Sequence, residues 1–312
     1  MASLTNDDYT IAWICALLLE MAAARVMLDR IHNPLPIPPA DPNAYVLGEL
    51  NGHRIVVACL PVGVYGIISA ATVVSHVVST FPRIQFGLMV GIGGGVPSTR
   101  NDIRLGDVVV SKPIGKYSGV IQYDYGKAVQ GRQFKPTGTL NKPPQTLLTH
   151  MVQLEATQMT RREDTISIIV WEVLEQNPDM KVRFSPPQEY TDYLFRSSYR
   201  HVDKKGNCEN CDKEQLINRQ SRDTRAPYIH YGLIASGDKV MKDSEIRDHI
   251  GQRYGILCFE MEAAGLMDKL PTLAIRGICD YCDSHKQKQW QGYAALTAAA
   301  YTKMLLGLDK VW

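Results

Sequence analysis

Four carboxylates follow apolar segments of the sequence at positions where strands would end. Glu20 comes after the first such segment, Glu260 and Glu262 after a later one, and Asp280 after another. Because ligands of α/β sheets gather at the carboxyl ends of the strands, these side chains are candidates for acid and base chemistry on a polar small molecule. The alternative is structural, since an acidic residue in the first turn of a helix is favoured by the helix dipole.

A glycine-rich segment, Gly91-Ile92-Gly93-Gly94-Gly95, follows another apolar segment. With few side chains in the way, its backbone N–H groups could approach an anion or a hydroxyl of a ligand. The segment does not match the dinucleotide-binding fingerprint, and no Gly-Lys-Ser or Gly-Lys-Thr follows it as in a phosphate-binding P-loop. The structural alternative is a tight turn from strand to loop that requires a positive φ.

The segments that would position these residues alternate between strand and helix patterns. Short apolar runs predict buried strands, and stretches rich in Ala, Leu and Met predict helices. Strands are expected at 10–17, 45–50, 54–60, 86–90, 107–111, 229–235, 255–259 and 272–278, and helices from Leu18 onward and at 64–80, 261–270 and 291–308. Asn51-Gly52 predicts a hairpin between the second and third strands. The alternation predicts the α/β class with a layered sheet.

Composition excludes several classes of protein. The chain has 312 residues, and 34 Lys and Arg stand against 32 Asp and Glu, a net charge of +2 that is too small for a surface that tracks nucleic-acid phosphates. Hydrophobic residues make up 45% and charged residues 21%, which predicts a large packed core. No apolar run reaches the ~18 residues of a membrane span, and the polar, acidic start is not a signal peptide, so we expect a cytoplasmic protein without a membrane partner.

The positions of the cysteines are consistent with a cytoplasmic protein. Five of the seven lie in or beside apolar runs and are expected to be buried and reduced: Cys15, Cys59, Cys258, Cys279 and Cys282. The other two form Cys208-x-x-Cys211, in a polar stretch that also contains His201, Asp203, Asp212 and, further on, His230. Two thiolates and one or two of the histidines could hold a structural zinc ion. Since a second ligand pair at a standard spacing is missing, free or redox-active thiols are the alternative.

The cysteine pair lies in a long segment, about 154–227, that differs from the rest of the chain. It is charged and poor in strand patterning. We interpret it as an insertion or subdomain on the core rather than as a second independent domain. Beyond it, Asp280 to His285 holds an Asp, a Cys and a His close together, but no oxyanion loop accompanies them, so we place His285 at the rim of a site and expect no cysteine nucleophile.

Several segments together resemble the purine nucleoside phosphorylase and nucleosidase superfamily, over about residues 9–310. The resemblance rests on four elements in the family's order: the glycine segment and next strand (90–96 and 105–111), Ser236-Gly237-Asp238, Phe259-Glu260-Met261-Glu262-Ala263-Ala264, and Arg276-Gly277-Ile278-Cys279-Asp280. The sequence is most similar to the fungal branch of that family. The resemblance implies a single α/β domain, in which a central twisted mixed sheet partly closes into a barrel and is flanked by helices, with an insertion.

The resemblance also implies cleavage of a purine N-glycosidic bond by either phosphate or water. Phosphorylases of the family carry a Gly-Asp-Pro-x-Arg turn after the first strand, where this sequence has no Arg before Arg25. The positions that hold an Arg and a Ser near the glycine segment of hexameric phosphorylases are Met89 and Ile92 here. A desolvated phosphate without cationic partners is very costly. Glu20 instead matches the carboxylate with which methylthioadenosine/S-adenosylhomocysteine nucleosidases activate water, so hydrolysis is favoured.

By the same resemblance, each site residue has its own role. Asp280 is the general acid that protonates N7 of the departing purine. Glu262 accepts hydrogen bonds from the ribose 2′- and 3′-hydroxyls and stabilises the cationic sugar of the transition state. Glu20 orients and deprotonates the attacking water. Arg276 fixes that water and the nearby carboxylates, and Met261 packs under the sugar.

The binding pocket is less defined by the sequence. The ligand would approach the backbone at Ile92 and Gly93, and the purine edge would meet backbone groups near Val240 and Met241. Val240 is aliphatic where nucleosidases often have an aromatic residue, so the stacking ring is left open among Tyr123, Tyr125, Tyr190 and Phe195. Because the Asp280 carboxyl can serve both N7 and a 6-amino group, adenine is favoured. The 5′ substituent stays open between a hydroxyl, a thioether, and a triphosphate held by Arg183, Arg196, Arg200, Lys204 and Lys205.

The implied partner is a small purine nucleoside rather than a nucleic acid. The implied reaction requires no cofactor, and the implied assembly is a homodimer, because relatives complete the pocket with a neighbour's loop. The alternatives are a phosphorylase that forms ribose-1-phosphate, a nucleosidase that acts on ATP, and a module that binds a nucleoside without turnover. The joint presence of Glu20, Glu262 and Asp280 argues against the last.

Overall fold

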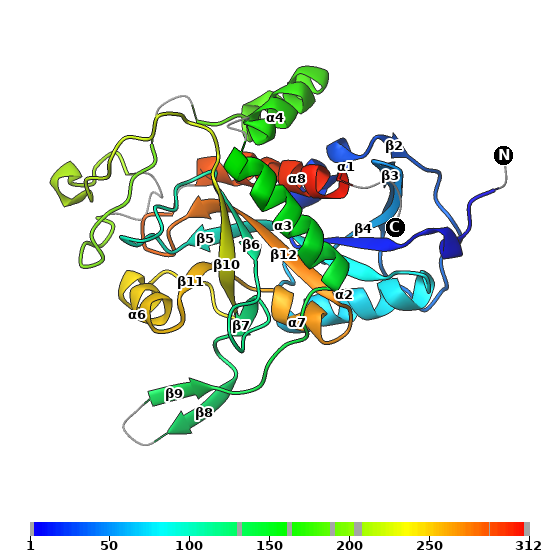
Figure 1. The fold of residues 1–312 in the computed structure, drawn as a ribbon, viewed down its shortest axis with the longest axis horizontal. Coiled ribbons are helices and arrows are strands. Elements are labelled where there is room, and N and C mark those ends of the chain that lie inside the picture. Colours follow the sequence, from blue (N-terminus) through cyan, green and yellow to red (C-terminus); the bar gives the residue numbers. More distant parts are fainter. Residues whose placement is uncertain are drawn as a thin grey trace.

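The computed structural model of the protein describes residues 3–129, 133–160, 164–187, 191–202, 208–286 and 288–308. Within these ranges the chain folds around one large mixed sheet with helices on both sides (Figure 1). The strands are β1 Ile11–Cys15, β2 Arg30–Ile31, β3 Tyr45–Leu50, β4 His53–Cys59, β5 Phe86–Gly95, β6 Val108–Ser111, β7 Val120–Gln122, β8 Gly126–Val129, β9 Gln133–Pro136, β10 Ile229–Ser236, β11 Ile256–Glu260 and β12 Thr272–Asp280. The helices are α1 Leu18–Met27, α2 Ile67–Thr80, α3 Gln145–Thr160, α4 Thr165–Gln176, α5 Lys181–Phe184, α6 Ser244–Tyr254, α7 Ala263–Met267 and α8 Gln291–Leu306.

The main sheet runs in the order β11-β10-β6-β12-β5-β1-β4-β3-β2, and β7 pairs with β10. β1 is parallel to both of its neighbours, and β12 is parallel to β5 and antiparallel to β6. β1 and β12 are buried along their whole length, and strands buried on both faces need continuous apolar sequence. The predicted hairpin is confirmed, since β3 and β4 pair antiparallel around Asn51 and Gly52, which both have a positive φ.

Part of the sheet closes on itself. β11 pairs with β10 on one side and with β5 on the other, where Phe259 lies opposite Gly94 and Cys258 opposite Gly95. The strands β5, β11, β10, β6 and β12 therefore form a ring. This closure confirms the expected partly barrel-like sheet.

The glycine segment is not the loop or tight turn that the sequence indicated. β5 continues as a strand through Gly95, and no glycine of this segment has a positive φ. Glycine is needed here for close approach, because a Cβ at Gly94 would collide with Sγ of Cys282 and would lie 2.8 Å from Oδ1 of Asp280. The end of β5 can therefore pack between β11 and β12, which brings their functional side chains together.

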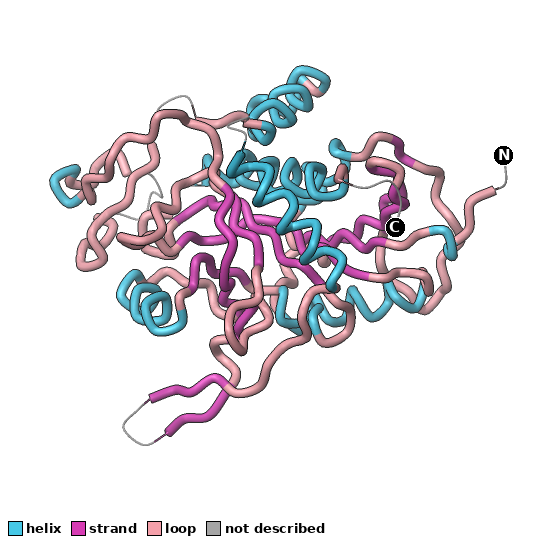
Figure 2. Tube along the Cα trace, in the orientation of Figure 1, coloured by secondary structure: helices cyan, strands magenta, loops and turns pink. Residues whose placement is uncertain are grey.

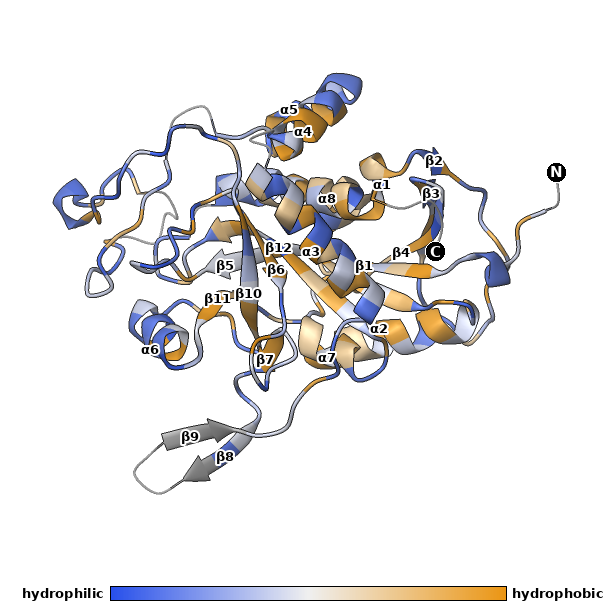
Figure 3. Cartoon of the chain, in the orientation of Figure 1, coloured by the Kyte–Doolittle hydropathy of each residue, from blue (hydrophilic) through white to orange (hydrophobic). Residues whose placement is uncertain are grey.

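The helices form a layer on each side of the sheet (Figures 1 and 2). α8 contacts α1, α4, α5 and β12 on one side, and α2 contacts α7 on the other. Apolar residues concentrate in the central strands and in the helices that pack on them (Figure 3). α8 is buried along most of its length, as expected of a core helix. In the part of the chain that the structure describes, no helix is long and apolar enough to cross a membrane.

The charged stretch at about 154–227 adds no strand to the main sheet among its described residues. It contributes α4 and α5, which pack on α8, and a long irregular segment. The end of the stretch is anchored to the core by the buried Asp107, whose Oδ2 lies 2.7 Å from Nη2 of Arg222 and 2.9 Å from Nε2 of His230. That this stretch is an insertion relative to the family stays a prediction.

Candidate active site

A cleft of about 1940 Å³ opens at the carboxyl ends of the central strands. It brings together residues that come from the junction of β1 and α1, from β5, β11 and β12, and from the segment after β10. The predicted site residues that line it are Glu20, Ile92, Gly93, Val240, Met241, Met261, Glu262 and Asp280. Arg276 does not line the cleft and lies fully buried next to it.

Glu20 is held in place at the junction between β1 and α1. Its Oε2 accepts hydrogen bonds from the backbone N–H groups of Ala16 (2.7 Å) and Leu17 (3.0 Å), and its Oε1 accepts one from Ile92 (2.8 Å). A carboxylate offers about four lone-pair sites, so these bonds leave room for one further donor, such as a water molecule in the cleft. Burial raises the pKa of Glu20, while Arg276 and the three N–H groups oppose this shift. A carboxylate with a raised pKa is a stronger base, which suits activation of water.

Arg276 supports the carboxylates from beneath the cleft. Its Nη2 contacts Glu260 and lies 3.5 Å from Oε2 of Glu262. A Cβ at Gly91 would collide with the Glu20 carboxylate and would lie 2.7 Å from Nη1 of Arg276. Glycine is therefore required where these two side chains meet β5. Because Arg276 is buried under the carboxylates, we assign it as a positioning residue.

The two glutamates at the end of β11, Glu260 and Glu262, differ in their surroundings. Glu260 accepts hydrogen bonds from the N–H groups of Glu262 (3.0 Å) and Ala263 (2.9 Å), so it caps the start of α7, as the structural alternative described. Glu262 faces the cleft, and its Oε2 accepts a 3.3 Å bond from the N–H of Met261. Burial raises the pKa of Glu262 to about 8. The charge of Arg276 opposes this shift, and the carboxylates of Glu260 and Glu20 add to it.

The raised pKa of Glu262 predicts a pH-dependent stability. Between its ordinary pKa of 4.5 and about 8, the folded protein holds a proton that the unfolded chain has lost, so stability falls as pH rises through this range. Glu262→Gln cannot ionise, so its unfolding temperature should exceed that of the wild type by more at pH 9 than at pH 5. A change of about 1 kcal/mol in the free energy of unfolding shifts the unfolding temperature of a large domain by roughly 2–4 °C. Calorimetry that gave parallel pH profiles for both proteins would contradict this expectation.

Asp280 lies at the end of β12 and faces the cleft. Its Oδ1 accepts a hydrogen bond from the N–H of Cys282 (2.8 Å), and its Oδ2 lies 3.0 Å from Nζ of Lys286. Sequence reasoning missed Lys286, which belongs to the irregular segment after β12 and matches no quoted motif. Burial lowers the pKa of Lys286, but the Asp280 carboxylate and the neighbouring thiols raise it above its usual value, so this side chain stays protonated. A cation therefore lies beside the candidate acid.

None of the described candidates for base stacking lines the cleft. Tyr123 is buried against the ring of Phe259, with the ring centroids 5.3 Å apart, and Tyr125 is exposed. Phe195 is buried in a separate cluster. Tyr190 lies outside the described residues.

Among the described residues, the rings that line the cleft are those of Phe259, Tyr65 and Phe184. Phe259 directly precedes Glu260 in one of the four elements that resemble the family, so a local signal for it existed. Tyr65 and Phe184 come from segments far apart in the sequence, and no pattern connects them to the strand ends. Phe259 is the ring closest in sequence to Glu262, which makes it a candidate for a ligand contact.

Basic side chains also line the cleft. Those among the described residues are Lys181, Arg183, Lys239, Lys286 and Lys288. Arg183 is thus the one described member of the suggested triphosphate-binding group that reaches the cleft, because Arg196 and Arg200 do not line it. Lys204 and Lys205 lie outside the described residues. Several cations around one cleft favour a ligand with an anionic substituent.

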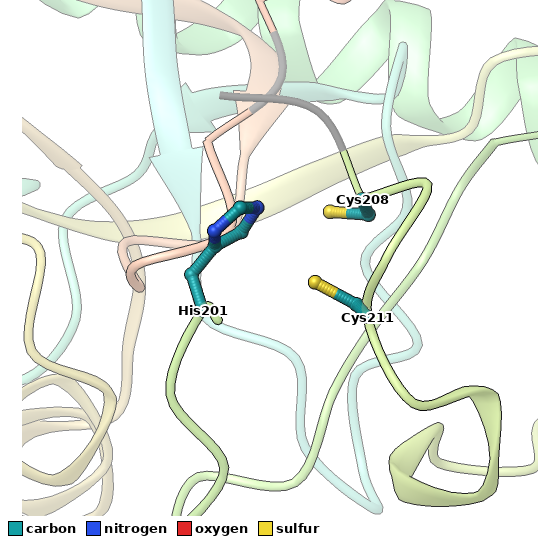
Figure 4. A group of neighbouring side chains, drawn as sticks. All are labelled: His201, Cys208 and Cys211. Atoms are coloured by element: carbon teal, nitrogen blue, oxygen red, sulfur yellow. The ribbon is translucent and has the colours of Figure 1, made fainter. Parts of the chain in front are cut away.

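The Cys208-x-x-Cys211 pair meets a histidine (Figure 4). One ligand atom each from His201, Cys208 and Cys211 lie within 4.8 Å of one another, and both cysteines are buried. All seven cysteines of the chain are described, and none is in a disulfide. Of the five expected to be buried, Cys59 is only half-buried.

The other residues considered as metal ligands lie elsewhere or are not described. His230 lies outside the group formed by His201, Cys208 and Cys211, and its Nε2 contacts Asp107. Asp212 is engaged as the cap of the short turn after Cys211, where its Oδ1 accepts a hydrogen bond from Glu214. Asp203 lies outside the described residues.

The partly closed mixed sheet and the carboxylates around its strand ends define a nucleoside phosphorylase-like protein. The chain belongs to the phosphorylase superfamily, since residues 10–305 match the family model of that description. This match confirms the family that the motifs indicated.

Similar curated proteins include two larger proteins. A "Nucleotide-binding leucine-rich repeat (NLR)-like protein" of Hyaloscypha variabilis is 45% identical over 305 residues, which is 97% of this chain and 30% of that protein. "ATP nucleosidase Cap17" of Escherichia coli is 25% identical over 244 residues, which is 76% of this chain and 38% of that protein. The chain therefore spans about a third of the length of these relatives.

Solved structures share the fold. The 5′-methylthioadenosine/S-adenosylhomocysteine nucleosidase of Neisseria meningitidis, in complex with methylthio-immucillin-A, superposes with a TM-score of 0.60 at 17% identity, covering 96% of this chain and 98% of that chain. Futalosine hydrolase of Helicobacter pylori gives a TM-score of 0.57 at 14% identity, covering 96% and 97%. Similarity at this level of identity establishes the architecture, and the similar structures include nucleosidases.

Proposed function

We propose that the protein hydrolyses the N-glycosidic bond of a purine ribonucleoside, with adenine as the favoured base, to release the free base and ribose. The observation that carries this proposal is the position of Glu20. Its carboxylate lines the cleft and is fixed by three backbone hydrogen bonds. A fixed anion at this point repels phosphate and can accept a proton from water.

The other carboxylates complete the proposed mechanism. Glu262, in its ionised form, accepts hydrogen bonds from the ribose hydroxyls and stabilises the positive charge that develops on the sugar. Asp280 donates a proton to N7, so that the purine leaves as a neutral base while the C1′–N9 bond breaks. Water supplies the new bond to C1′, and its proton passes to Glu20. The side chains of the protein carry these steps in this proposal, and no cofactor takes part.

A second candidate substrate is a purine nucleoside triphosphate. Lys181, Arg183, Lys239, Lys286 and Lys288 line the cleft and could bind the phosphates. The E. coli relative named as an ATP nucleosidase is consistent with this candidate, although its identity to this chain is 25%. The glycosidic chemistry would be the same, since the phosphates lie on the 5′ side of the ribose and the broken bond is at C1′.

One assay separates these possibilities. The protein is incubated with adenosine or ATP, with and without inorganic phosphate, and the base and sugar products are identified by chromatography and mass spectrometry. Free ribose or ribose triphosphate, formed at the same rate without phosphate, supports hydrolysis. Formation of ribose-1-phosphate would establish a phosphorylase, and the absence of any free base would establish a binding module.

Charge-neutralising variants distinguish the two substrates. If ATP is bound as proposed, Arg183→Gln and Lys288→Gln should each reduce kcat/KM for ATP more than for adenosine, by up to about fivefold, which is the effect of about 1 kcal/mol for an exposed charge pair. Lys269→Gln is the matched control, because Lys269 is exposed and does not line the cleft. Equal effects on both substrates would contradict phosphate binding by these side chains.

A further inference from the structure

A cluster of metal-ligating side chains lies outside the residues used by the proposed reaction. His201, Cys208 and Cys211 point toward one another in Figure 4, with one ligand atom from each within 4.8 Å of the others. Cys208 and Cys211 enclose a tight turn, in which the N–H of Cys211 donates to the carbonyl of Cys208. A turn with Cys-x-x-Cys spacing presents two sulfurs on the same side, as structural zinc sites require.

A candidate for the fourth ligand, His285, comes from a distant part of the sequence and lies beside the three residues whose ligand atoms are within 4.8 Å of one another, not among them. His285 is 5% exposed, and its Nε2 has no hydrogen-bond partner in the structure. Its ring centroid lies 5.3 Å from that of His201. Two imidazoles on one tetrahedral ion, with Zn–N bonds of about 2.0–2.1 Å, hold their ring centroids about 5 Å apart. The unpaired nitrogen and the spacing of the rings both fit a shared metal ion.

The surroundings of His285 fix its ring for such a role. The ring stacks on Phe195 and on Tyr199, with centroid distances of 4.1 Å and 5.4 Å. Its other nitrogen, Nδ1, lies 3.7 Å from a carboxylate oxygen of Asp283. Metal-bound histidines usually have a carboxylate or carbonyl at the nitrogen that does not bind the metal. A stacked ring with a carboxylate near Nδ1 leaves Nε2 as the ligand.

We propose that Cys208, Cys211, His201 and His285 bind a structural zinc ion. Two thiolates and two neutral imidazoles form a closed tetrahedral set, and binding releases the two thiol protons. The ion would join the segment 191–217 to the segment after β12, which the hydrogen bond from the His201 N–H to Ser284 Oγ (3.0 Å) already links. This proposal does not depend on the identity of the reaction.

A zinc ion at this position would also affect the segment that follows β12. His285 directly precedes Lys286, whose Nζ lies 3.0 Å from Oδ2 of Asp280. A zinc ion bound to His285 would therefore hold the segment that carries the partner of the candidate acid. We expect loss of the metal to lower the unfolding temperature of the protein directly. Its activity should fall as a consequence, because the position of Lys286 beside Asp280 depends on this segment.

The test measures metal in the full-length chain. Protein purified without chelators is analysed by inductively coupled plasma mass spectrometry, and we expect about one zinc ion per chain. Cys208→Ser, Cys211→Ser, His201→Ala and His285→Ala should each lose at least tenfold in zinc occupancy. Cys59→Ser and His249→Ala are the matched controls and should keep it, because Cys59 is in β4 and His249 is exposed on α6.

Two further measurements keep the proposal falsifiable if a variant folds poorly. In the first, reconstitution of the wild type with cobalt should give the visible absorption of a tetrahedral ion and a thiolate charge-transfer band. In the second, a chelator should lower the unfolding temperature of the wild type but not of C208S. A wild type without metal after zinc addition, or one that is 2 Da lighter because Cys208 and Cys211 form a disulfide, would overturn the proposal. Full zinc occupancy in His285→Ala would remove His285 as a ligand and overturn the four-residue site.

Discussion

Asp280→Asn should lower kcat for adenosine by about 10²–10⁴-fold, which is the usual contribution of a general acid. The carboxamide can still accept the hydrogen bond from the N–H of Cys282, while the ion pair with Lys286 is lost. It cannot transfer a proton to N7, and the purine would have to leave as an anion. The measurement is steady-state release of adenine, with circular dichroism to show that the variant is folded.

A control and a second substrate make this prediction specific. Asp268→Asn removes an exposed carboxylate that neither lines the cleft nor takes part in the proposed metal site, so its kcat should stay within about threefold of wild type. A riboside with a p-nitrophenolate leaving group needs no protonation, so Asp280→Asn should cleave it with a much smaller loss. Equal losses on both substrates, or a wild-type rate with adenosine, would remove Asp280 as the acid.

The central strands of the sheet could be predicted because burial on both faces demands continuous apolar sequence, whereas the short strands β2 and β7 were not predicted. β1 and β12 were recognised in this way, and the Asn51-Gly52 hairpin was recognised from its turn residues. The ring closure between β11 and β5 has no local signal, because it joins segments that are far apart in the sequence. It was expected only from the family resemblance.

The glycine segment was identified from the sequence as a special feature, but its conformation was predicted wrongly. Glycine serves both positive φ angles and close packing of neighbouring atoms, and a sequence does not distinguish the two. At Gly91 and Gly94 the reason is close packing, against Glu20 and Arg276 in one case and against Cys282 and Asp280 in the other. Knowledge of the neighbours was needed to choose between these explanations.

The site residues that could be predicted are those in which a family motif lies at the end of a strand. Glu20, Glu262 and Asp280 line one cleft because β1, β11 and β12 end at the same edge of the sheet. Lys286 and His285 were missed as partners because they lie in an irregular segment that no periodic pattern describes. Their contacts, with Asp280 in one case and with His201 in the other, depend on tertiary packing alone.

Glu20→Gln should lower kcat for hydrolysis by about 10²–10⁴-fold, because the amide cannot take a proton from water. The substitution also disturbs the site, since an amide has one acceptor oxygen and the carboxylate of Glu20 uses both of its oxygens to accept from Ala16, Leu17 and Ile92. At least one buried N–H would then lose its acceptor, at a cost of about 1–3 kcal/mol, so the unfolding temperature should fall as well. Glu155→Gln, on a partly exposed carboxylate that does not line the cleft, is the control.

Phosphate distinguishes the two roles that a carboxylate at this position can have. If Glu20 only excluded phosphate, its neutralisation would allow phosphorolysis, and Glu20→Gln would form ribose-1-phosphate in phosphate buffer. We expect no sugar phosphate, because the positions that bear an Arg and a Ser in related phosphorylases are the apolar Met89 and Ile92, and removal of one anion does not create the cations and hydroxyls that hold a desolvated phosphate. Sugar phosphate formation by the variant, or hydrolysis at the wild-type rate, would show that water activation by Glu20 is not the basis of the reaction.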